Sequence, residues 1–210
     1  MIVHCVRHGE SEFNSEGRVQ GHLDVPLSAL GRRQAAAVAT ALAAETSEII
    51  FASPLRRARE TAEIISQRLG LLVETDPRLK EINVGIFQGK RRDELPRLYP
   101  EEFARWKQND PDFTIPGGES QKDLERRGLE VFEAIRRSGR REAVVVAHGR
   151  LLIVVLRALM PDIADLRETS GLENGSITTL VLDAPGQAKL VRFNDVEHLA
   201  NVGMSGPGDL

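Results

Sequence analysis

The chain has 210 residues, of which 41% are hydrophobic and 28% are charged, and its formal net charge is −3. This composition is typical of a globular α/β protein, and it excludes binding to nucleic acid or to an anionic membrane through a large excess of positive charge. The single cysteine, Cys5, excludes a disulfide within the chain, and the first residues lack the pattern of a secretory signal. We therefore expect a cytoplasmic protein without nucleic-acid or membrane partners.

The first eighty residues are predicted to alternate strands and helices. Short apolar runs predict buried strands at residues 2–6, 49–52 and 71–73. Ser28 is a helix N-cap, and apolar residues at helical spacing follow it as far as Leu42. Pro54 suits the first turn of a second helix, which Gly70 ends.

The middle of the chain has a different character from the rest. Residues 83–119 contain four prolines, several aromatic residues and many charges, and they predict an inserted cap with short helices near 93–98 and 101–107. Beyond the cap, the pattern predicts a long amphipathic helix, a strand, a helix and a closing hairpin: residues 120–137, 143–147, 151–160, and 176–182 with 189–193.

Strands that alternate with helices indicate a mostly parallel sheet that is covered on both faces. We predict a three-layer α/β/α sandwich with about six strands, of which the closing hairpin supplies an antiparallel edge strand. No repeat or long linker divides the chain, so residues 1–210 are predicted to form a single domain with a cap inserted at about 83–119.

Two of the predicted strands end in the same way. His8-Gly9 follows the first strand, and His148-Gly149 follows the strand at 143–147. Arg7 precedes the first histidine, arginines 56, 57 and 59 follow the second strand, and Glu81 follows the third. Because ligands bind beyond the carboxyl ends of parallel strands, we expect these side chains to share one site.

Histidines, arginines and a carboxylate suit the transfer of a phosphoryl group. The planar guanidinium group matches the oxygens of a phosphate dianion. A neutral imidazole attacks phosphorus without a separate base, and Glu81 would protonate the leaving oxygen if bound phosphate raises its pKa. Spacing alone does not decide between Arg56 and Arg57.

The sequence resembles the histidine phosphatase superfamily, in its phosphoglycerate mutase-like branch, from residue 2 to about residue 193. The matching pieces, in the family's order, are residues 7–11 with Asn14, 21–28 with Gly31, 53–58 with Thr61 and Ala62, 79–82 with Gly85, 116–120, and 148–149. One Arg-His-Gly triplet is weak support for such a resemblance, whereas six pieces in register are strong support.

The resemblance implies a role for each residue. His8 would carry the phosphoryl group, Arg7, Arg57 and His148 would hold its oxygens, and Glu81 would act first as the acid and then as the base that activates water. Substrate contacts are expected from Asn14, Gln20, Gly21, His22 and Gly149. No metal and no cofactor is expected, and the expected partner is a small phosphorylated metabolite, bound by a monomer or a homodimer.

Other chemistries fit the residues less well. Cysteine-dependent phosphatases need an arginine six residues after the cysteine, and Ser11 occupies that position, so Cys5 is expected to be a core residue. Metal-ligand spacings of the type His-x-x-x-His and a Gly-Lys-Ser/Thr phosphate loop are absent from the sequence.

Within the resemblance, a phosphatase is favoured over a mutase. In the mutase pattern an aromatic residue closely follows the acid glutamate, but no tyrosine stands between Glu81 and Gly85 here. The segment 93–120 resembles a compact phosphatase cap. A phosphoglycerate mutase is the alternative, and a binding module without catalysis is the second alternative. The basic run 90–92 is expected to be solvated, with contact to an acidic substrate as its minor alternative.

Overall fold

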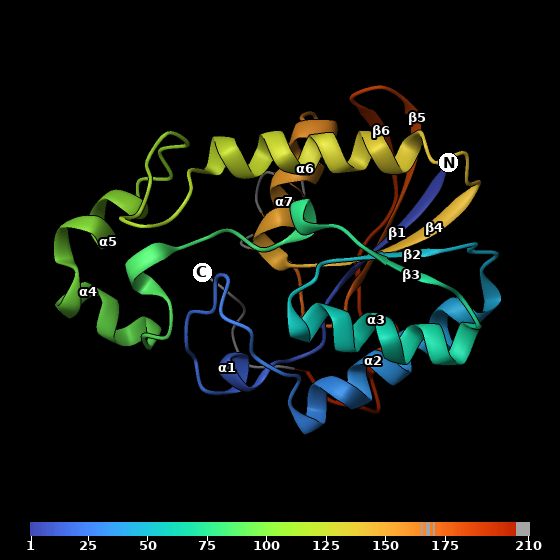
Figure 1. Cartoon of the computed structure of the whole chain (residues 1–210), viewed down its shortest axis with the longest axis horizontal. Coiled ribbons are helices and arrows are strands. Elements are labelled where there is room, and N and C mark those ends of the chain that lie inside the picture. Colours follow the sequence, from blue (N-terminus) through green and yellow to red (C-terminus); the bar gives the residue numbers. More distant parts are fainter. Residues whose placement is uncertain (165, 167–168, 170, 205–210) are drawn as a thin grey trace.

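The computed structural model of the chain describes residues 1–164, 166, 169 and 171–204 (Figure 1). Within these residues one six-stranded sheet has the order β3-β2-β4-β1-β5-β6. The strands are β1 (Ile2–Arg7), β2 (Ile50–Ala52), β3 (Val73–Thr75), β4 (Glu142–Ala147), β5 (Ile177–Ala184) and β6 (Gln187–Asp195). Strands β1 to β4 run parallel, while β5 pairs antiparallel with both β1 and β6. The predicted mixed, mostly parallel sheet is confirmed.

Helices α2 to α7 occur where the sequence predicts them, whereas the short helix α1 lies in a segment that the sequence predicts to be a loop. The α-helices are α1 (Glu12–Ser15), α2 (Ala29–Ala41), α3 (Arg56–Leu69), α4 (Leu95–Leu98), α5 (Pro100–Trp106), α6 (Gln121–Arg136) and α7 (Gly149–Leu159). The short 3-10 helices are η1 (Leu42–Ala44), η2 (Pro77–Leu79), η3 (Gly85–Phe87), η4 (Arg92–Glu94) and η5 (Glu197–Leu199). The Ser28 and Ser120 hydroxyls cap α2 and α6, and Gly70 ends α3 with a φ of 69°.

Helices cover the sheet on both faces, as the three-layer prediction requires (Figure 1). Helices α6 and α7 bury their apolar faces against Val3, Cys5 and Val145. Helices α2 and α3 pack against the opposite face, where Val6 and Val144 lie. Every residue of β4 is buried, because this central strand has helices on both sides. The expectation that Cys5 is a core residue is confirmed, since its side chain is 1% exposed.

Several predicted boundaries differ from the structure by one or two residues, and two of the differences have a clear physical reason. The third strand begins at Val73 instead of residue 71, and the apolar Leu72 is 76% exposed in the connection before it. Strand β3 is an edge strand, so apolar character there does not mark the paired residues. Helix α3 begins at Arg56, after Pro54, because Ser53 still donates its N–H to the Val146 carbonyl of the sheet at 3.0 Å.

The segment at 83–119 contains the two predicted short helices and has an apolar cluster of its own. Val84, Phe87, Leu95 and Ile115 are buried together with Val19. In Figure 1 helices α4 and α5 lie to one side of the sheet, away from β1 and β4. The assignment of this segment as the cap of a single domain stays a prediction. None of the helices in the described residues combines the length and the apolar character that a membrane span needs.

Candidate active site

Parallel pairing of β1 with β4 brings two histidines together. The register pairs Arg7 with Ala147, so His8 and His148 are the next residues on each strand. The backbone N–H of His8 donates to the carbonyl of Ala147 at 3.0 Å. The two imidazole rings meet edge to face, with centroids 5.1 Å apart. The two predicted strand ends therefore do share one site.

The chain after His8 passes so close to α2 that both contact positions must be glycine. A Cβ atom on Gly9 would lie 2.4 Å from the carbonyl oxygen of Gly31. A Cβ atom on Gly31 would lie 1.9 Å from the carbonyl oxygen of Glu10. The Ser28 hydroxyl, which caps α2, also donates to the Glu10 carboxylate at 2.7 Å. The start of α2 thus fixes the backbone that carries His8.

The hydrogen bonds of His8 define which ring nitrogen holds its proton. The side chain is fully buried, and Nδ1 lies 2.7 Å from the carbonyl oxygen of Gly9. A carbonyl oxygen only accepts, so Nδ1 carries the hydrogen and donates it. Arg57 Nε donates to His8 Nε2 at 3.3 Å. The imidazole is therefore assigned as neutral, with a lone pair on Nε2.

The structure distinguishes Arg57 from Arg56. Arg57, in the first turn of α3, is 1% exposed and donates to the carbonyls of Gly21 at 2.9 Å and Leu23 at 3.0 Å. Arg56 points outward, with a side chain that is 46% exposed and paired with Glu60. Of these two arginines, Arg57 is the one that donates to His8.

Arg7 lies at the end of β1 beside the first turn of α7. Its side chain is 1% exposed, and its guanidinium group donates to the carbonyl of Leu172. A Cβ atom on Gly149 would lie 3.3 Å from Arg7 Nε. The glycine after His148 therefore leaves room for Arg7, which is the contact that the structure shows for Gly149.

His148 is a neutral hydrogen-bond donor in this environment. Complete burial lowers its pKa well below the usual value, and the charges of Arg57 and Arg7 lower it further. His148 Nε2 lies 2.7 Å from Ser53 Oγ, which itself accepts from the Leu55 N–H at 3.3 Å. The Ser53 hydrogen is therefore assigned to the bond with Nε2, and the ring hydrogen to Nδ1. Among the described residues Nδ1 has no hydrogen-bond partner.

Glu81 is held against the amino end of α7. Its carboxylate accepts from the backbone N–H groups of Ile82 at 2.9 Å, Leu151 at 3.0 Å and Arg150 at 3.1 Å. The positive end of the helix dipole favours a carboxylate in this position. Because His148 is the N-cap of the same helix, α7 positions both groups.

A pocket beside these groups contains part of the predicted substrate set. It is lined by Val19, Gln20, Gly21, Arg57, Glu81, Ile82, Val84 and Arg150. Asn14 is not in the lining. It accepts from the Ser11 hydroxyl at 2.9 Å, and the same hydroxyl is 2.7 Å from Gln20 Oε1. His22 is not in the lining either. Its Nε2 donates to the Glu81 carbonyl at 2.7 Å, and burial lowers its pKa.

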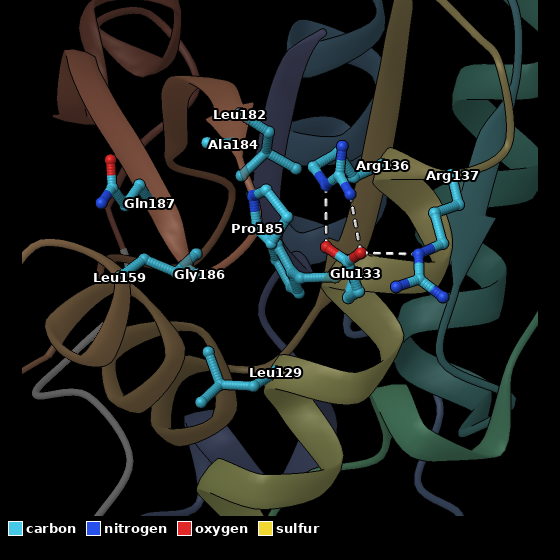
Figure 2. Close-up of a pocket in the computed structure, with 11 residues that line it drawn as sticks. Leu129, Glu133, Arg136, Arg137, Leu159, Leu182, Ala184, Pro185, Gly186 and Gln187 are labelled. Carbon is cyan, nitrogen blue, oxygen red and sulfur yellow. Dashed lines mark hydrogen bonds and ion pairs between the residues drawn. The ribbon is translucent and has the colours of Figure 1, made fainter.

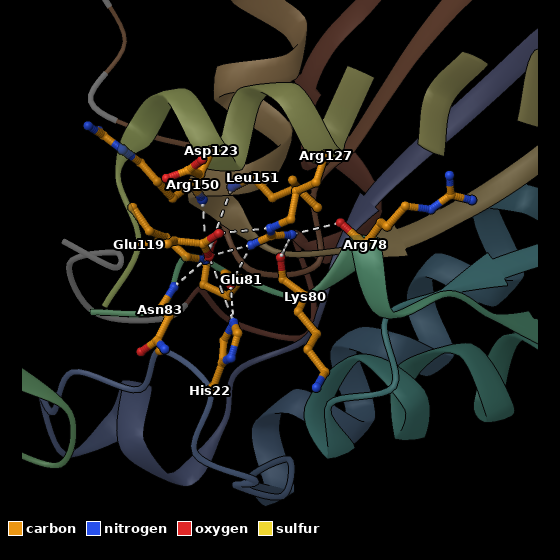
Figure 3. A network of polar contacts seen from close by, with 12 residues as sticks. His22, Arg78, Lys80, Glu81, Asn83, Glu119, Asp123, Arg127, Arg150 and Leu151 are labelled. Atoms are coloured by element: carbon orange, nitrogen blue, oxygen red, sulfur yellow. Dashed lines mark hydrogen bonds and ion pairs between the residues drawn. The ribbon is translucent and has the colours of Figure 1, made fainter. Parts of the chain in front are cut away.

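Sequence reasoning missed two residues that support the site. Asn174 donates to the carbonyl of His8 at 3.0 Å and lies 3.4 Å from Asn14 Oδ1. Arg127 of α6 donates to the carbonyls of Arg78, Lys80 and Glu81 at 2.7, 2.6 and 2.9 Å (Figure 3). The same guanidinium group forms an ion pair with Glu119 at 2.7 Å. An Asn-Gly pair before a strand was the only available signal for Asn174, and Arg127 resembles any solvated arginine of an amphipathic helix.

Two other places lie apart from the histidines. A groove between α6, α7 and the β5–β6 turn is shown in Figure 2; in it Glu133 is held by Arg136 and Arg137, which lower its pKa to about 2. His4, Glu45 and Glu142 place possible metal-ligand atoms within 4.8 Å of one another. His4 Nδ1 is also 3.0 Å from Thr179 Oγ1, and Glu142 accepts from Thr46 and Ser47. Neither place contains a group of the predicted site.

The buried state of His148 predicts a pH dependence of stability. A histidine of the unfolded chain titrates near about 6.5, whereas folded His148 takes up a proton only at much lower pH. Below about pH 6.5 the unfolded chain therefore binds more protons, and the free energy of unfolding falls as the pH is lowered. Urea unfolding between about pH 7 and 5 should show a steeper loss in the wild type than in His148→Gln. An NMR titration of His148 that is centred near about pH 6.5 would contradict this account.

Comparisons with known proteins agree with this geometry. The model of the histidine phosphatase superfamily (branch 1) matches residues 3–196. A phosphoglycerate mutase-like protein 4 from Arabidopsis thaliana is 36% identical, over 94% of this chain and 86% of the relative. A metal-independent phosphoserine phosphatase from the same plant is 34% identical, over 94% of this chain and 83% of the relative.

A solved structure agrees equally well. Mycobacterial glucosyl-3-phosphoglycerate phosphatase in complex with VO3 superposes with a TM-score of 0.83 at 32% identity, over 93% of this chain and 99% of that chain. The sequence match, the fold and these relatives together support one conclusion. The chain belongs to the histidine phosphatase superfamily, branch 1.

Proposed function

We propose that the protein is a metal-independent phosphomonoesterase that hydrolyses a small phosphorylated metabolite through a phosphohistidine on His8. The observation that carries this proposal is the lone pair of His8 Nε2, which is fixed by the bond from Nδ1 to Gly9 and directed toward Arg57. A buried neutral imidazole beside a guanidinium group combines a nucleophile with a binding site for the phosphoryl oxygens.

In the first step His8 Nε2 attacks phosphorus and the bond from phosphorus to the leaving oxygen breaks. Arg7 and Arg57 would hold the phosphoryl oxygens, since both guanidinium groups are buried at the ring of His8 or beside His148. His148 would donate its Nδ1 hydrogen to a phosphoryl oxygen, because Nδ1 has no hydrogen-bond partner among the described residues. Glu81 would transfer a proton to the leaving oxygen, which departs as an alcohol.

In the second step water attacks the phosphohistidine, Glu81 takes the proton of that water, and His8 returns to its neutral form with release of phosphate. Burial of Glu81 and the charge of a bound phosphate favour the protonated acid before the first step. The hydrogen bonds from the backbone N–H groups of α7 favour the ionised carboxylate of Glu81, which serves as the base in the second step. Residues 83–119 would cover this reaction as the cap of a single domain.

A mutase is the alternative, because a phosphohistidine can return its phosphoryl group to a second position of the substrate instead of to water. This chain resembles a relative that is named a phosphoglycerate mutase-like protein and another that is named a phosphoserine phosphatase. The hydrolase is supported by the segment 81–85, which lacks the mutase tyrosine, and by the phosphatase names of relatives that match over most of their length.

Removal of metal should leave the reaction intact. Phosphate release from p-nitrophenyl phosphate and 3-phosphoglycerate is measured in EDTA, with 2-phosphoglycerate assayed in the same samples. We expect full activity in EDTA and a loss of at least about a thousandfold in His8→Ala. His4→Gln, a buried histidine on the same strand, is the matched control and should keep its activity. Loss of activity in EDTA would contradict the proposal, and 2-phosphoglycerate without phosphate would identify a mutase.

The leaving group should reveal the proton donated by Glu81. An alkoxide needs this proton, whereas p-nitrophenolate is stable without it. In Glu81→Gln we expect kcat/KM to fall by about a hundredfold for an alkyl phosphate and far less for p-nitrophenyl phosphate. Glu63→Gln, which alters an exposed carboxylate of α3 that is paired with Arg59, is the control. Equal losses for the two substrates would exclude Glu81 as the acid.

A further inference from the structure

A second pocket adjoins the one that contains Arg57 and Glu81. It is lined by Ile82, Trp106, Asn109, Asp110, Phe113, Ile115, Glu119, Gln121 and Arg150. Ile82 and Arg150 line both pockets. A substrate whose phosphoryl group lies at His8 and whose leaving oxygen faces Glu81 therefore extends its leaving group toward Arg150.

Arg150 is the cation at this boundary, and Glu81 is the carboxylate whose negative charge acts on it. Arg150 Nη2 donates to the Gln121 amide oxygen at 2.6 Å, and within the described ranges the guanidinium group forms no ion pair. Arg127, by contrast, is paired with Glu119. Arg150 is half-buried, and this burial lowers the pKa of its guanidinium group, whereas the charge of Glu81 raises it. A guanidinium group that is partly withdrawn from water and forms no ion pair would gain from an anion of the substrate that binds it directly.

The other charges of the second pocket indicate which anion fits. Glu119 and Asp110 also line it, so the pocket holds two carboxylates besides the guanidinium group of Arg150. A second phosphate, with two negative charges, would face these carboxylates with a single guanidinium group to balance it. A carboxylate carries one charge and accepts two parallel hydrogen bonds from one guanidinium group. Trp106, Phe113 and Ile115 provide an apolar wall for the carbon skeleton.

We propose that Arg150 binds a carboxylate on the leaving group, so that the protein selects phosphorylated acids over phosphomonoesters that lack the acid. This inference rests on the proposed function, because it takes the leaving group to depart beside Glu81. Arg150 contributes to the site in two separate ways. Its backbone N–H donates to the Glu81 carboxylate, and its guanidinium group would bind the carboxylate of the substrate. A substitution of the side chain therefore leaves the backbone hydrogen bond in place.

Two pairs of substrates isolate the carboxylate. 3-Phosphoglycerate and glycerol 3-phosphate differ in a carboxylate that replaces a hydroxymethyl group, and phosphoserine and phosphoethanolamine differ in a carboxylate that replaces hydrogen. We expect the wild type to prefer the acid of each pair by about ten- to a hundredfold in kcat/KM, mainly through KM. In Arg150→Met this ratio should fall to near one, and Arg150→Lys should restore part of it.

Arg126→Met is the matched control, because Arg126 is an exposed arginine of α6 that is paired with Asp123. Its ratio should equal that of the wild type. A wild type that hydrolyses both members of each pair equally, or a preference that survives in Arg150→Met, would overturn the assignment of Arg150. Failure of the proposed function gives a different result, namely no hydrolysis of any of the four substrates or hydrolysis that survives in His8→Ala.

Discussion

The parallel pairing of β1 with β4 is the constraint on which the site depends. Hydrogen bonds of the sheet continue to the last residue of each strand, so the two residues that follow, His8 and His148, have little freedom in where they stand. Gly9 then meets Gly31 of α2, which fixes the backbone after His8. The carbonyl of Gly9 in turn selects the hydrogen-bearing nitrogen of the ring. The chemistry of one imidazole is therefore determined by backbone geometry.

The electrostatics of the site follow from burial. Arg7 and Arg57 are almost fully buried next to His8 and His148, and burial lowers the pKa of His148 well below its usual value. Positive charge in such a place is compensated in part by backbone carbonyls, since Arg57 donates to Gly21 and Leu23 and Arg7 to Leu172. A phosphate dianion offers far stronger compensation than these dipoles do. The buried arginines therefore give the site an affinity for anions, and their burial lowers the free energy of unfolding while no anion is bound.

Most of the fold and the central residues follow from the sequence, because they depend on local patterns. Apolar runs predict β1 and β4, a serine cap predicts α2, an amphipathic pattern predicts α6, and His-Gly after each of two strands places both histidines. The exposed Leu72 shows where this reasoning fails, since an edge strand does not need apolar residues at its paired positions. Arg127 and Asn174 could not be predicted, because their partners are backbone carbonyls more than forty residues away in the chain. The choice of Arg57 over Arg56 needed either the resemblance or the direction in which each side chain leaves α3.

The most direct test of this account is the position of the phosphoryl group on His8. The protein would be quenched in alkali during turnover, and the phosphohistidine identified by mass spectrometry and by the ³¹P NMR shift that separates the two ring isomers. The account predicts a phosphoryl group on Nε2 of His8, because Nδ1 is engaged with the carbonyl of Gly9. Phosphorylation on Nδ1, on another residue, or on none would contradict it.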